Sequence, residues 1–557
     1  MSEAGSIVSR TYGSFLGVDF RGDDINLRRS PDCLNVWKDY KDVDGIRTRP
    51  DMELKDSFDK PVYGIFFYNN ILLVHSGTDL YSVTNGTMEV IYSGLKEAKS
   101  QSFIFGNLWY FKDGANYLKY DGTTIGEVVG YVPTTSIARK PAGGGTIYED
   151  VNLLTGKRIN TFLADGESTE FVLDAKDIDA DYTPIVKVND EVTTDFTVDY
   201  ENGKIIFKKA PTIPLTDGQD NVSVEFRKTI SGYADRIKKS TLLQVFDNRV
   251  FFSGNPDFPN TLWHCSLDDP AYCSDLDYYY EGQDNAMVTG LVAGNNALWV
   301  FREPSQANTA VFYHTPTIDS DYGKIYPSTH SSVTTGCVGR AINFNDDIVF
   351  FSERGMEGIS GDITTEQVLG HRSSLVDRKM IAEPDYKDMV LEEWEGYLLV
   401  FIGSRVYLAD SRAVFTNTDH GEYEWFYWEL NKKVICARVE KGILYIGTED
   451  GVYTLTSNGN VESYWTTPKD KFKYGNRLKT SNKRGCTAEA TGDIAVYAKI
   501  EDTDFELIGE YKNVTDYFVS RIKRKKFKDI QLKFHSQTKF HLEQVTLECF
   551  VGGYIKR

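Results

Sequence analysis

Hydrophobic and polar positions follow one repeated pattern along most of this 557-residue chain. An apolar run reaches a two-residue polar turn, and a second, strongly hydrophobic run leaves it, as in Ile71–Val74, Leu298–Phe301 and Leu398–Phe401. Short polar turns between such runs are hairpin signals. The seven turns lie at Asn69-Asn70, Gly106-Asn107, Asp247-Asn248, Asn295-Asn296, Asn345-Asp346, Glu395-Gly396 and Lys441-Gly442.

The spacing of these turns predicts the fold. Successive turns are 37 to 50 residues apart, except for one gap of 141 residues between Gly106 and Asp247. This is the period of a β-propeller blade, a four-stranded unit that buries both faces only when its neighbours stack on it. We therefore expect an all-β chain, a β-propeller of about seven blade-like repeats.

The long gap predicts an insertion that opens at the glycine-rich stretch 140–145 and ends near Gly232. Strand-like runs between hairpin turns, such as Asp165-Gly166 and Asn202-Gly203, indicate a small β-sandwich there. Similar alternation at the C-terminus predicts a second sandwich. The expected domains are 1–60, an entry segment that closes the propeller by adding an outer strand to the last blade; 61–140 and 233–465, the propeller; 141–232, the inserted domain; and 466–557, the C-terminal sandwich.

A helical pattern stands out in one place. Ser373 to Glu383 carries apolar residues at helical spacing, and Pro384 acts as a stop signal. Elsewhere we expect strands.

Composition limits the location of the protein. The sequence has no run of 18 apolar residues and no signal-peptide pattern after Met1, so we expect no membrane insertion. The seven cysteines are scattered and form no C-x-x-C pair, which argues against a disulfide framework or a zinc ribbon. A reducing compartment is expected.

Charge is distributed unevenly along the chain. Residues 466–557 carry 19 Lys and Arg against 12 Asp and Glu, a net charge of +7, whereas the whole chain carries −19. The other 465 residues therefore carry −26. An acidic bulk keeps a large assembly soluble and repels DNA phosphates.

Two basic stretches in the C-terminal part are the candidate sites for contact with a partner or with phosphate. Either stretch could contact an acidic subunit or DNA phosphates. The alternative is a solvated hairpin surface, since charges and apolar residues alternate there. The candidate residues are Lys469, Lys471, Lys473, Arg477, Lys483, Arg484, Arg521, Lys523, Arg524, Lys525 and Lys526.

No pattern for catalysis, metal or cofactor binding is visible in the sequence. The eight histidines are dispersed, and neither H-E-x-x-H, G-x-S-x-G nor a P-loop occurs. Trp263, Trp299, Trp394 and Trp428 could stack on sugars, but tryptophans inside apolar strands are usually core residues. We predict no catalytic residue, no metal, no cofactor and no enzymatic activity, while a glycosidase built from paired carboxylates is a weak alternative.

Several stretches resemble tailed-bacteriophage virion proteins of the DNA-stabilisation, tail-hub or tail-nozzle family. They are Phe20-Arg-Gly-Asp-Asp-Ile-Asn-Leu, Ser30-Pro-Asp-Cys-Leu-Asn-Val, Gly45-Ile-Arg-Thr-Arg-Pro, Val250-Phe-Phe-Ser-Gly-Asn-Pro-Asp-Phe-Pro-Asn, Phe550-Val-Gly-Gly-Tyr and, in the insertion, 162–173. Together these stretches extend over most of the chain.

The resemblance implies a structural role in the virion neck or tail, after assembly in the host cytoplasm. Such proteins form a ring, commonly a hexamer, below the phage portal and adaptor. The ring lengthens the channel for genomic DNA, without sequence-specific binding, and helps to retain and release the genome. Expected partners are other copies of the chain, the portal or adaptor, and other tail proteins. The main alternative is a receptor- or glycan-binding propeller at the virion surface.

Overall fold

The computed structural model describes residues 7–23, 25–41, 45–306, 310–320, 323–360, 368–410, 412, 422–523 and 526–554; the side chains of residues 483, 484, 553 and 554 are excluded. Strands dominate the described chain. No helix in these ranges is long and apolar enough to cross a membrane.

The fold is a β-propeller, and the described residues contain seven four-stranded antiparallel sheets as its blades. The first blade along the chain consists of β6 (Val62–Tyr68), β7 (Ile71–Ser76), β8 (Asp79–Thr84) and β9 (Thr87–Ser93). The second blade consists of β10 (Gln101–Phe105), β11 (Leu108–Lys112), β12 (Tyr117–Tyr120) and β13 (Ile125–Glu127). Two blades follow the insertion. The first consists of β23 (Leu242–Phe246), β24 (Arg249–Ser253), β25 (Thr261–His264) and β26 (Tyr278–Tyr280). The second consists of β27 (Val288–Gly294), β28 (Ala297–Arg302), β29 (Val311–His314) and β32 (Ser328–His330).

The fifth blade consists of β33 (Ala341–Phe344), β34 (Asp347–Ser352), β35 (Gly355–Ser360) and β36 (Val368–His371). The sixth consists of β37 (Val390–Trp394), β38 (Tyr397–Ile402), β39 (Arg405–Asp410) and β40 (Glu424–Glu429). The last consists of β41 (Cys436–Glu440), β42 (Ile443–Gly447), β43 (Gly451–Thr456) and β5 (Asp51–Ser57). A side hairpin, β30 (Thr317–Asp319) and β31 (Gly323–Ile325), leaves the β27–β32 blade.

The seven turns of the sequence pattern join the first two strands of each blade. In six of them both turn residues have positive φ, for example 49° and 64° at Asn69 and Asn70. This is the backbone of a type I′ hairpin, which Asn, Asp and Gly adopt most easily. Glu395 and Lys441 adopt the same conformation, with φ of 51° and 52°.

By compactness the chain divides into two units. Unit 1 comprises Met1–Gly77, Tyr81–Glu89 and Thr335–Arg557, and unit 2 comprises Thr78–Leu80 and Val90–Thr334. The division passes through the β6–β9 blade, whose last two strands hold residues of both units.

The inserted domain belongs to unit 2 and has its own core. A six-stranded sheet has the order β15-β14-β16-β22-β18-β19, and a three-stranded sheet has the order β17-β21-β20. Phe162, Phe171 and Phe226 are fully buried among its side chains. Its first strand begins at Thr134, before the glycine-rich stretch that the sequence suggested as the opening. The strands are β14 (Thr134–Arg139), β15 (Thr146–Ile147), β16 (Lys157–Phe162), β17 (Glu170–Val172), β18 (Ile185–Val188), β19 (Glu191–Thr193), β20 (Phe196–Asp199), β21 (Lys204–Phe207) and β22 (Val222–Arg227).

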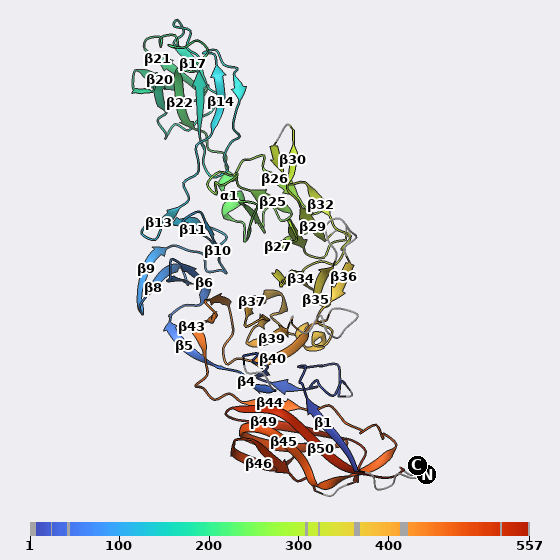
Figure 1. The fold of residues 1–557 in the computed structure, drawn as a ribbon. Coiled ribbons are helices and arrows are strands. Elements are labelled where there is room, and N and C mark those ends of the chain that lie inside the picture. Colours follow the sequence, from blue (N-terminus) through green and yellow to red (C-terminus); the bar gives the residue numbers. More distant parts are fainter. Residues whose placement is uncertain are drawn as a thin grey trace. The chain divides into compact units, whose positions relative to one another are not determined.

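The C-terminal β domain is built from both ends of the chain. The N-terminal strand β1 (Ile7–Gly13) pairs antiparallel with β50 (Phe540–Tyr554) along its whole length, as the blue and red strands of Figure 1 show. The domain therefore extends beyond the segment 466–557. Its other strands are β2 (Cys33–Leu34), β3 (Val36–Trp37), β4 (Ile46–Thr48), β44 (Ser463–Thr466), β45 (Arg477–Ile500), β46 (Glu506–Val514), β47 (Tyr517–Ser520), β48 (Lys526–Phe527) and β49 (Ile530–Ser536).

The entry segment also completes the last blade. β5 pairs antiparallel with β43, from Asp51 opposite Thr456 to Ser57 opposite Gly451. The last repeat supplies only β41, β42 and β43 to its blade, and β5 is the fourth, outer strand. One short segment therefore supplies strands to a blade and to the C-terminal domain.

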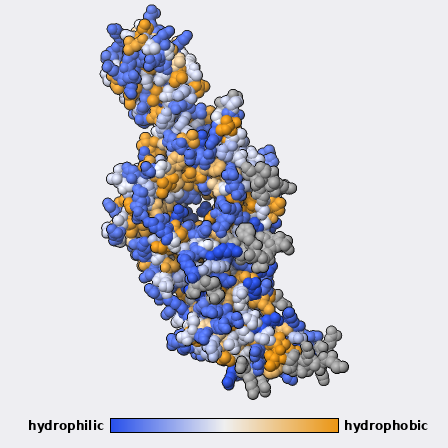
Figure 2. Space-filling model, viewed as in Figure 1, coloured by the Kyte–Doolittle hydropathy of each residue, from blue (hydrophilic) through white to orange (hydrophobic). Residues whose placement is uncertain are grey.

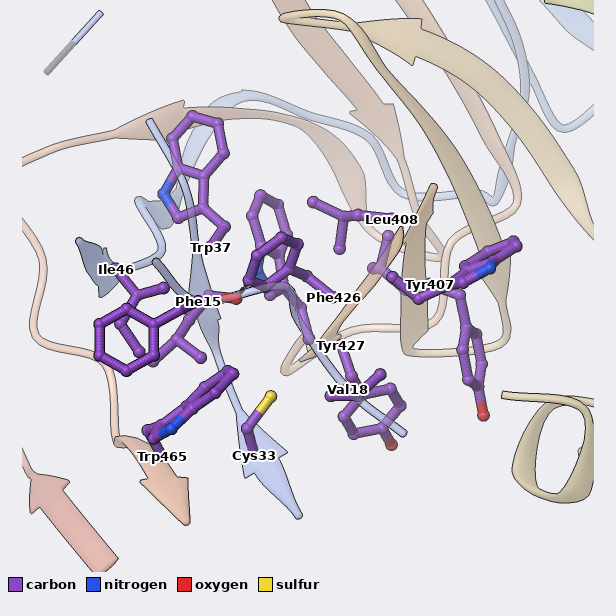
Figure 3. Packing of buried hydrophobic residues seen from close by; sticks show 14 of the residues in the cluster. Phe15, Val18, Cys33, Trp37, Ile46, Tyr407, Leu408, Phe426, Tyr427 and Trp465 are labelled. Carbon is purple, nitrogen blue, oxygen red and sulfur yellow. Dashed lines mark hydrogen bonds between the residues drawn. The ribbon is translucent and has the colours of Figure 1, made fainter. Parts of the chain in front are cut away.

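Between those two attachments the entry segment packs into a large aromatic core. Phe15 meets Trp465 edge to face at 5.0 Å, and Trp37 stacks on Trp394 at 5.2 Å. Figure 3 shows residues of the entry segment among those of the β37–β40 blade and β44. Since buried aromatic side chains contribute most to core energetics, this cluster fixes the segment in place.

The four tryptophans of the apolar strands are buried as expected, whereas the predicted helix is shorter. Trp263, Trp299, Trp394 and Trp428 are all buried, which confirms that they are core residues. The predicted helix over 373–383 is shorter: α2 spans Asp377–Met380, and a 3-10 turn, η1, spans Tyr386–Asp388. A second helix, α1 (Tyr233–Lys238), lies in unit 2 where no helix was expected.

Gly17 offers a test of how the entry segment is anchored. Its φ is 86°, it forms a bridge with Trp425, and a Cβ there would lie 1.9 Å from the Trp425 carbonyl oxygen. Gly86 has a similar φ of 78° but open space around it. We expect Gly17→Ala to lower the free energy of unfolding by at least about 2 kcal/mol more than Gly86→Ala, which costs only the left-handed backbone strain of about 1 kcal/mol.

Chemical denaturation followed by tryptophan fluorescence measures both variants. Equal midpoints for the two would show that the close approach of Gly17 to Trp425 does not hold the segment.

Candidate partner-contact surface

The two basic stretches lie at the same end of the C-terminal β domain. Strand β45 carries the first stretch onward from Arg477 and pairs with β48, which places Thr480 opposite Lys526. The same strand pairs with β47, with Cys486 opposite Ser520, directly before Arg521. The sheet therefore brings together residues about 40 positions apart in sequence.

Four of the candidate cations are exposed there, and we call them the basic end: Lys473, Arg521, Lys523 and Lys526. Within the described ranges, none of these four side chains forms an ion pair with a carboxylate. Four ammonium and guanidinium groups on one edge, on a chain of net charge −19, make a surface suited to an acidic partner or to phosphate.

Other candidates of the first stretch serve the domain itself. Lys469 is half-buried, and its Nζ lies 3.1 Å from Asp502 Oδ1 and 3.6 Å from Asp529 Oδ1. The hydrogen bond to Asp502 raises the pKa of this lysine. Arg477 is buried, with its guanidinium carbon 5.9 Å from the Tyr474 ring centre, and Lys471 is half-buried. The side chains of Lys483, Arg484, Arg524 and Lys525 lie outside the described residues.

Two residues that the sequence did not single out support the loop carrying Lys473. Lys479 is fully buried, and its Nζ donates to the carbonyls of Lys471 at 3.0 Å and Tyr474 at 2.7 Å. Burial lowers the pKa of Lys479. Asp470 accepts hydrogen bonds of 2.8 Å from Arg10 and Tyr12 on β1. Side-chain hydrogen bonds at Asp470, Lys471 and Tyr474 thus hold the loop on both sides of Lys473.

The cluster that looks most like a catalytic site lies in unit 2. Glu281 and His314 are fully buried, with Nε2 and Oε1 2.8 Å apart. The Ser328 hydroxyl donates to the other oxygen of Glu281 at 2.7 Å, and His314 Nδ1 faces the Tyr326 carbonyl at 2.8 Å. Ser328 bonds to the carboxylate and not to the imidazole, so the cluster lacks the serine–histidine contact of a histidine-activated nucleophile. We interpret this cluster as a satisfied buried network.

Metal binding gives no further candidate. No group of three or more His, Cys, Asp or Glu in the described ranges is arranged to hold a metal ion. None of the seven cysteines forms a disulfide, and six of them are buried. Figure 2 shows hydrophilic residues over most of the visible face, with small hydrophobic groups between them.

Comparison with known proteins finds distantly similar structures but no family. No family model and no curated protein matches it. Among solved structures it is similar to a streptogramin B lyase (TM-score 0.35, 11% identity, 73% of this chain and 97% of that chain) and to BamB from Moraxella catarrhalis (0.31, 9%, 78% and 94%), which are β-propeller proteins. A third is PorZ of the Porphyromonas gingivalis type-IX secretion system (0.27, 11%, 82% and 70%).

These neighbours differ in activity. The lyase and an exo-β-1,3-galactanase from Phanerochaete chrysosporium (TM-score 0.22, 8% identity, 55% of this chain and 94% of that chain) are enzymes. At such low identity no enzyme family is established for this chain.

His371 in unit 1 gives a pH-dependent test of the β33–β36 blade. Its Nε2 lies 2.5 Å from Asp377 Oδ2 and its Nδ1 lies 3.2 Å from Glu357 Oε2. The hydrogen bonds to Asp377 and Glu357 raise the pKa of His371 to about 10. Since an unfolded histidine has a pKa of about 6.5, the stabilisation is complete below that pH and is lost as the pH rises through about 10.

We expect His371→Gln to reduce the free energy of unfolding by about 1 to 2 kcal/mol at pH 6, and the difference from wild type to disappear towards pH 10. Denaturant titrations at several pH values measure it. A difference that stays constant with pH would contradict a charged His371 in the folded state. His330, which is exposed, gives the matched control, His330→Gln.

Proposed function

We propose that this protein is a structural virion protein of a tailed bacteriophage, a ring-forming subunit of the neck or tail nozzle. In that role it extends the DNA channel below the portal and helps to retain and release the genome. The observation that carries the proposal is the exposed basic end on an otherwise acidic propeller protein. The resemblance of the entry segment and insertion to tail-hub and tail-nozzle proteins supplies the biological setting.

The charge distribution supports assembly through the C-terminal β domain. A ring of identical subunits needs two different, complementary patches that close by rotation. The basic end offers one patch, and the remaining 465 residues, which carry a net charge of −26, offer acidic surface for the other. Repulsion between the acidic bulk and phosphate favours passage of DNA without sequence-specific binding. We keep a hexamer as the expected ring and the portal or adaptor as the expected neighbour.

We also propose that the protein is not an enzyme. The Ser328–Glu281–His314 arrangement supports this, because Ser328 and His314 bond to different oxygens of Glu281 and not to each other. The scaffold role needs no reacting group, only a rigid fold with contact surfaces.

Reversal of the basic end tests the proposal directly. We expect the combined variant Lys473→Glu, Arg521→Glu, Lys523→Glu and Lys526→Glu to raise the protein concentration needed for half-assembly at least about tenfold. Exposed ion pairs contribute about 0.2 to 1 kcal/mol each, and four are lost together. Mass photometry over a range of salt concentrations measures the oligomer distribution, and wild-type assembly should weaken as salt rises.

The matched control reverses four exposed cations elsewhere in unit 1: Lys60, Arg378, Lys387 and Lys441. Glutamate is compatible with the turn backbone at position 441, since Glu395 adopts it in the equivalent turn. This control should assemble as wild type does. A wild-type protein that stays monomeric, alone and with portal and adaptor, and is absent from purified virions by mass spectrometry, would refute the proposed function.

A short fluorescent DNA duplex distinguishes protein contact from phosphate contact. If the basic end binds phosphate, the fourfold variant should lose DNA binding and keep its assembly. If it binds a neighbouring subunit, assembly should be lost, and wild-type affinity for DNA should be weak and independent of sequence.

A further inference from the structure

A small pocket lies beside the basic end of the C-terminal β domain. The end of β45, the start of β46 and the segment that follows β47 form its walls. Its volume is about 90 Å³, which suits one aliphatic side chain. The lining combines apolar side chains with two cations of the basic end and one carboxylate: Ile500, Leu507, Ile508, Arg521, Lys523 and Glu506.

The apolar part of this pocket is open to solvent. Leu507 is 50% exposed, whereas Ile508 packs in part against the core. Arg521 and Lys523 are exposed, and neither forms an ion pair with a carboxylate of the described ranges. A recess of this kind fits a hydrophobic side chain that is itself flanked by carboxylates.

A segment with that composition is present in the inserted domain, in the loop 212–220 between β21 and β22. Leu215 is 94% exposed, more than any other large hydrophobic side chain in the part of the chain that the structure describes, and Ile213 is 62% exposed. Pro211 and Pro214 restrict the backbone around Ile213. This restriction lowers the entropy that the loop loses when it docks.

Asn221 holds this loop against two turns of the same domain. Its side chain donates to the Thr212 carbonyl at 2.8 Å and accepts from the Ala164 N–H at 3.0 Å, and its own carbonyl accepts from the Asn189 N–H at 2.8 Å. The loop therefore lies next to the turns at 165–167 and 189–191, and it has a fixed place at one end of the domain.

These three segments carry carboxylates that are not neutralised by a cation. Glu167, Glu191 and Asp217 are exposed, and none of the three forms an ion pair within the described ranges. Other carboxylates of the inserted domain are paired, as Glu170 is with Lys204 at 3.0 Å. The exposed Leu215 is thus surrounded by negative charge.

We propose that the pocket at the basic end binds the loop 212–220 of a second copy of this chain. Leu215 packs against Leu507, and the carboxylates around the loop face Arg521 and Lys523. The charges of the two domains agree with this contact: residues 141–232 carry 9 Lys and Arg against 17 Asp and Glu, a net charge of −8, and residues 466–557 carry +7.

The contact joins two different surfaces, so it can repeat from copy to copy around a closed ring. The inference therefore rests on the proposed ring-forming role, and it names the two patches that meet there.

Exchange of charge between the two surfaces tests the contact. The end variant is Arg521→Glu with Lys523→Glu, and the loop variant is Glu167→Lys with Glu191→Lys and Asp217→Lys. Each alone should need at least about a tenfold higher concentration for half-assembly, measured by mass photometry. An equimolar mixture should assemble close to the wild-type concentration, because each reversed surface then meets a partner of opposite charge.

Truncation of the apolar side chain tests the same contact without a change of charge. Leu215→Ala should raise the concentration for half-assembly about tenfold, at low and at high salt alike. The matched controls are Leu276→Ala, at a leucine that is 67% exposed, and the combined variant Glu89→Lys, Glu97→Lys and Glu201→Lys, at three exposed carboxylates elsewhere. Both controls should assemble as the wild type does.

The outcomes separate this contact from the ring itself. If the wild type assembles and both the loop variant and Leu215→Ala assemble equally well, the contact is wrong and the ring stands. The contact is also wrong if the two charge variants are folded by circular dichroism and their mixture stays monomeric. A monomeric wild type would overturn both the contact and the ring.

Discussion

Strand pairing between the two ends of the chain is the constraint on which the rest of unit 1 depends. The entry segment pairs through β1 and β4 with β50, through β2 with β44, and through β5 with β43. Each pairing joins residues at least 394 positions apart. Backbone N–H and C=O groups that these ladders satisfy would otherwise be buried without partners. The last blade and the C-terminal β domain are therefore stabilised by the same short segment.

This arrangement also determines where the basic end forms. Asp470, held by Arg10 and Tyr12 of β1, fixes the start of the loop that presents Lys473. The basic end thus depends on pairing that involves the first 50 residues, although it consists entirely of C-terminal side chains.

Exposed and buried polar groups serve different purposes in this molecule. A ring subunit needs long-range attraction and a rigid body, which exposed charges on a β scaffold supply at little cost in stability. The polar groups of the buried Glu281–His314 pair instead satisfy one another's hydrogen bonds inside the protein. Burial of a histidine beside a carboxylate therefore does not by itself indicate catalysis.

The sequence was sufficient for the local part of the fold. The two-residue turns require positive φ, and Asn, Asp and Gly accept it, so Asn295-Asn296 and Asn345-Asp346 identify their hairpins without tertiary information. The blade count and the presence of an insertion follow from the spacing of those turns. Burial of Trp299 and Trp428 follows from their place inside apolar strands.

Only the tertiary structure decided how distant segments meet. No periodicity indicates that Ile7–Gly13 pairs with β50, or that Lys479 turns inward to bind two carbonyls while Lys473 stays exposed. Strand alternation gives the face of a side chain relative to its own strand, but the partner strand depends on loop closure over hundreds of residues. The sequence by itself therefore determined the propeller and its repeats, and the meeting of the chain ends decided which cations face solvent.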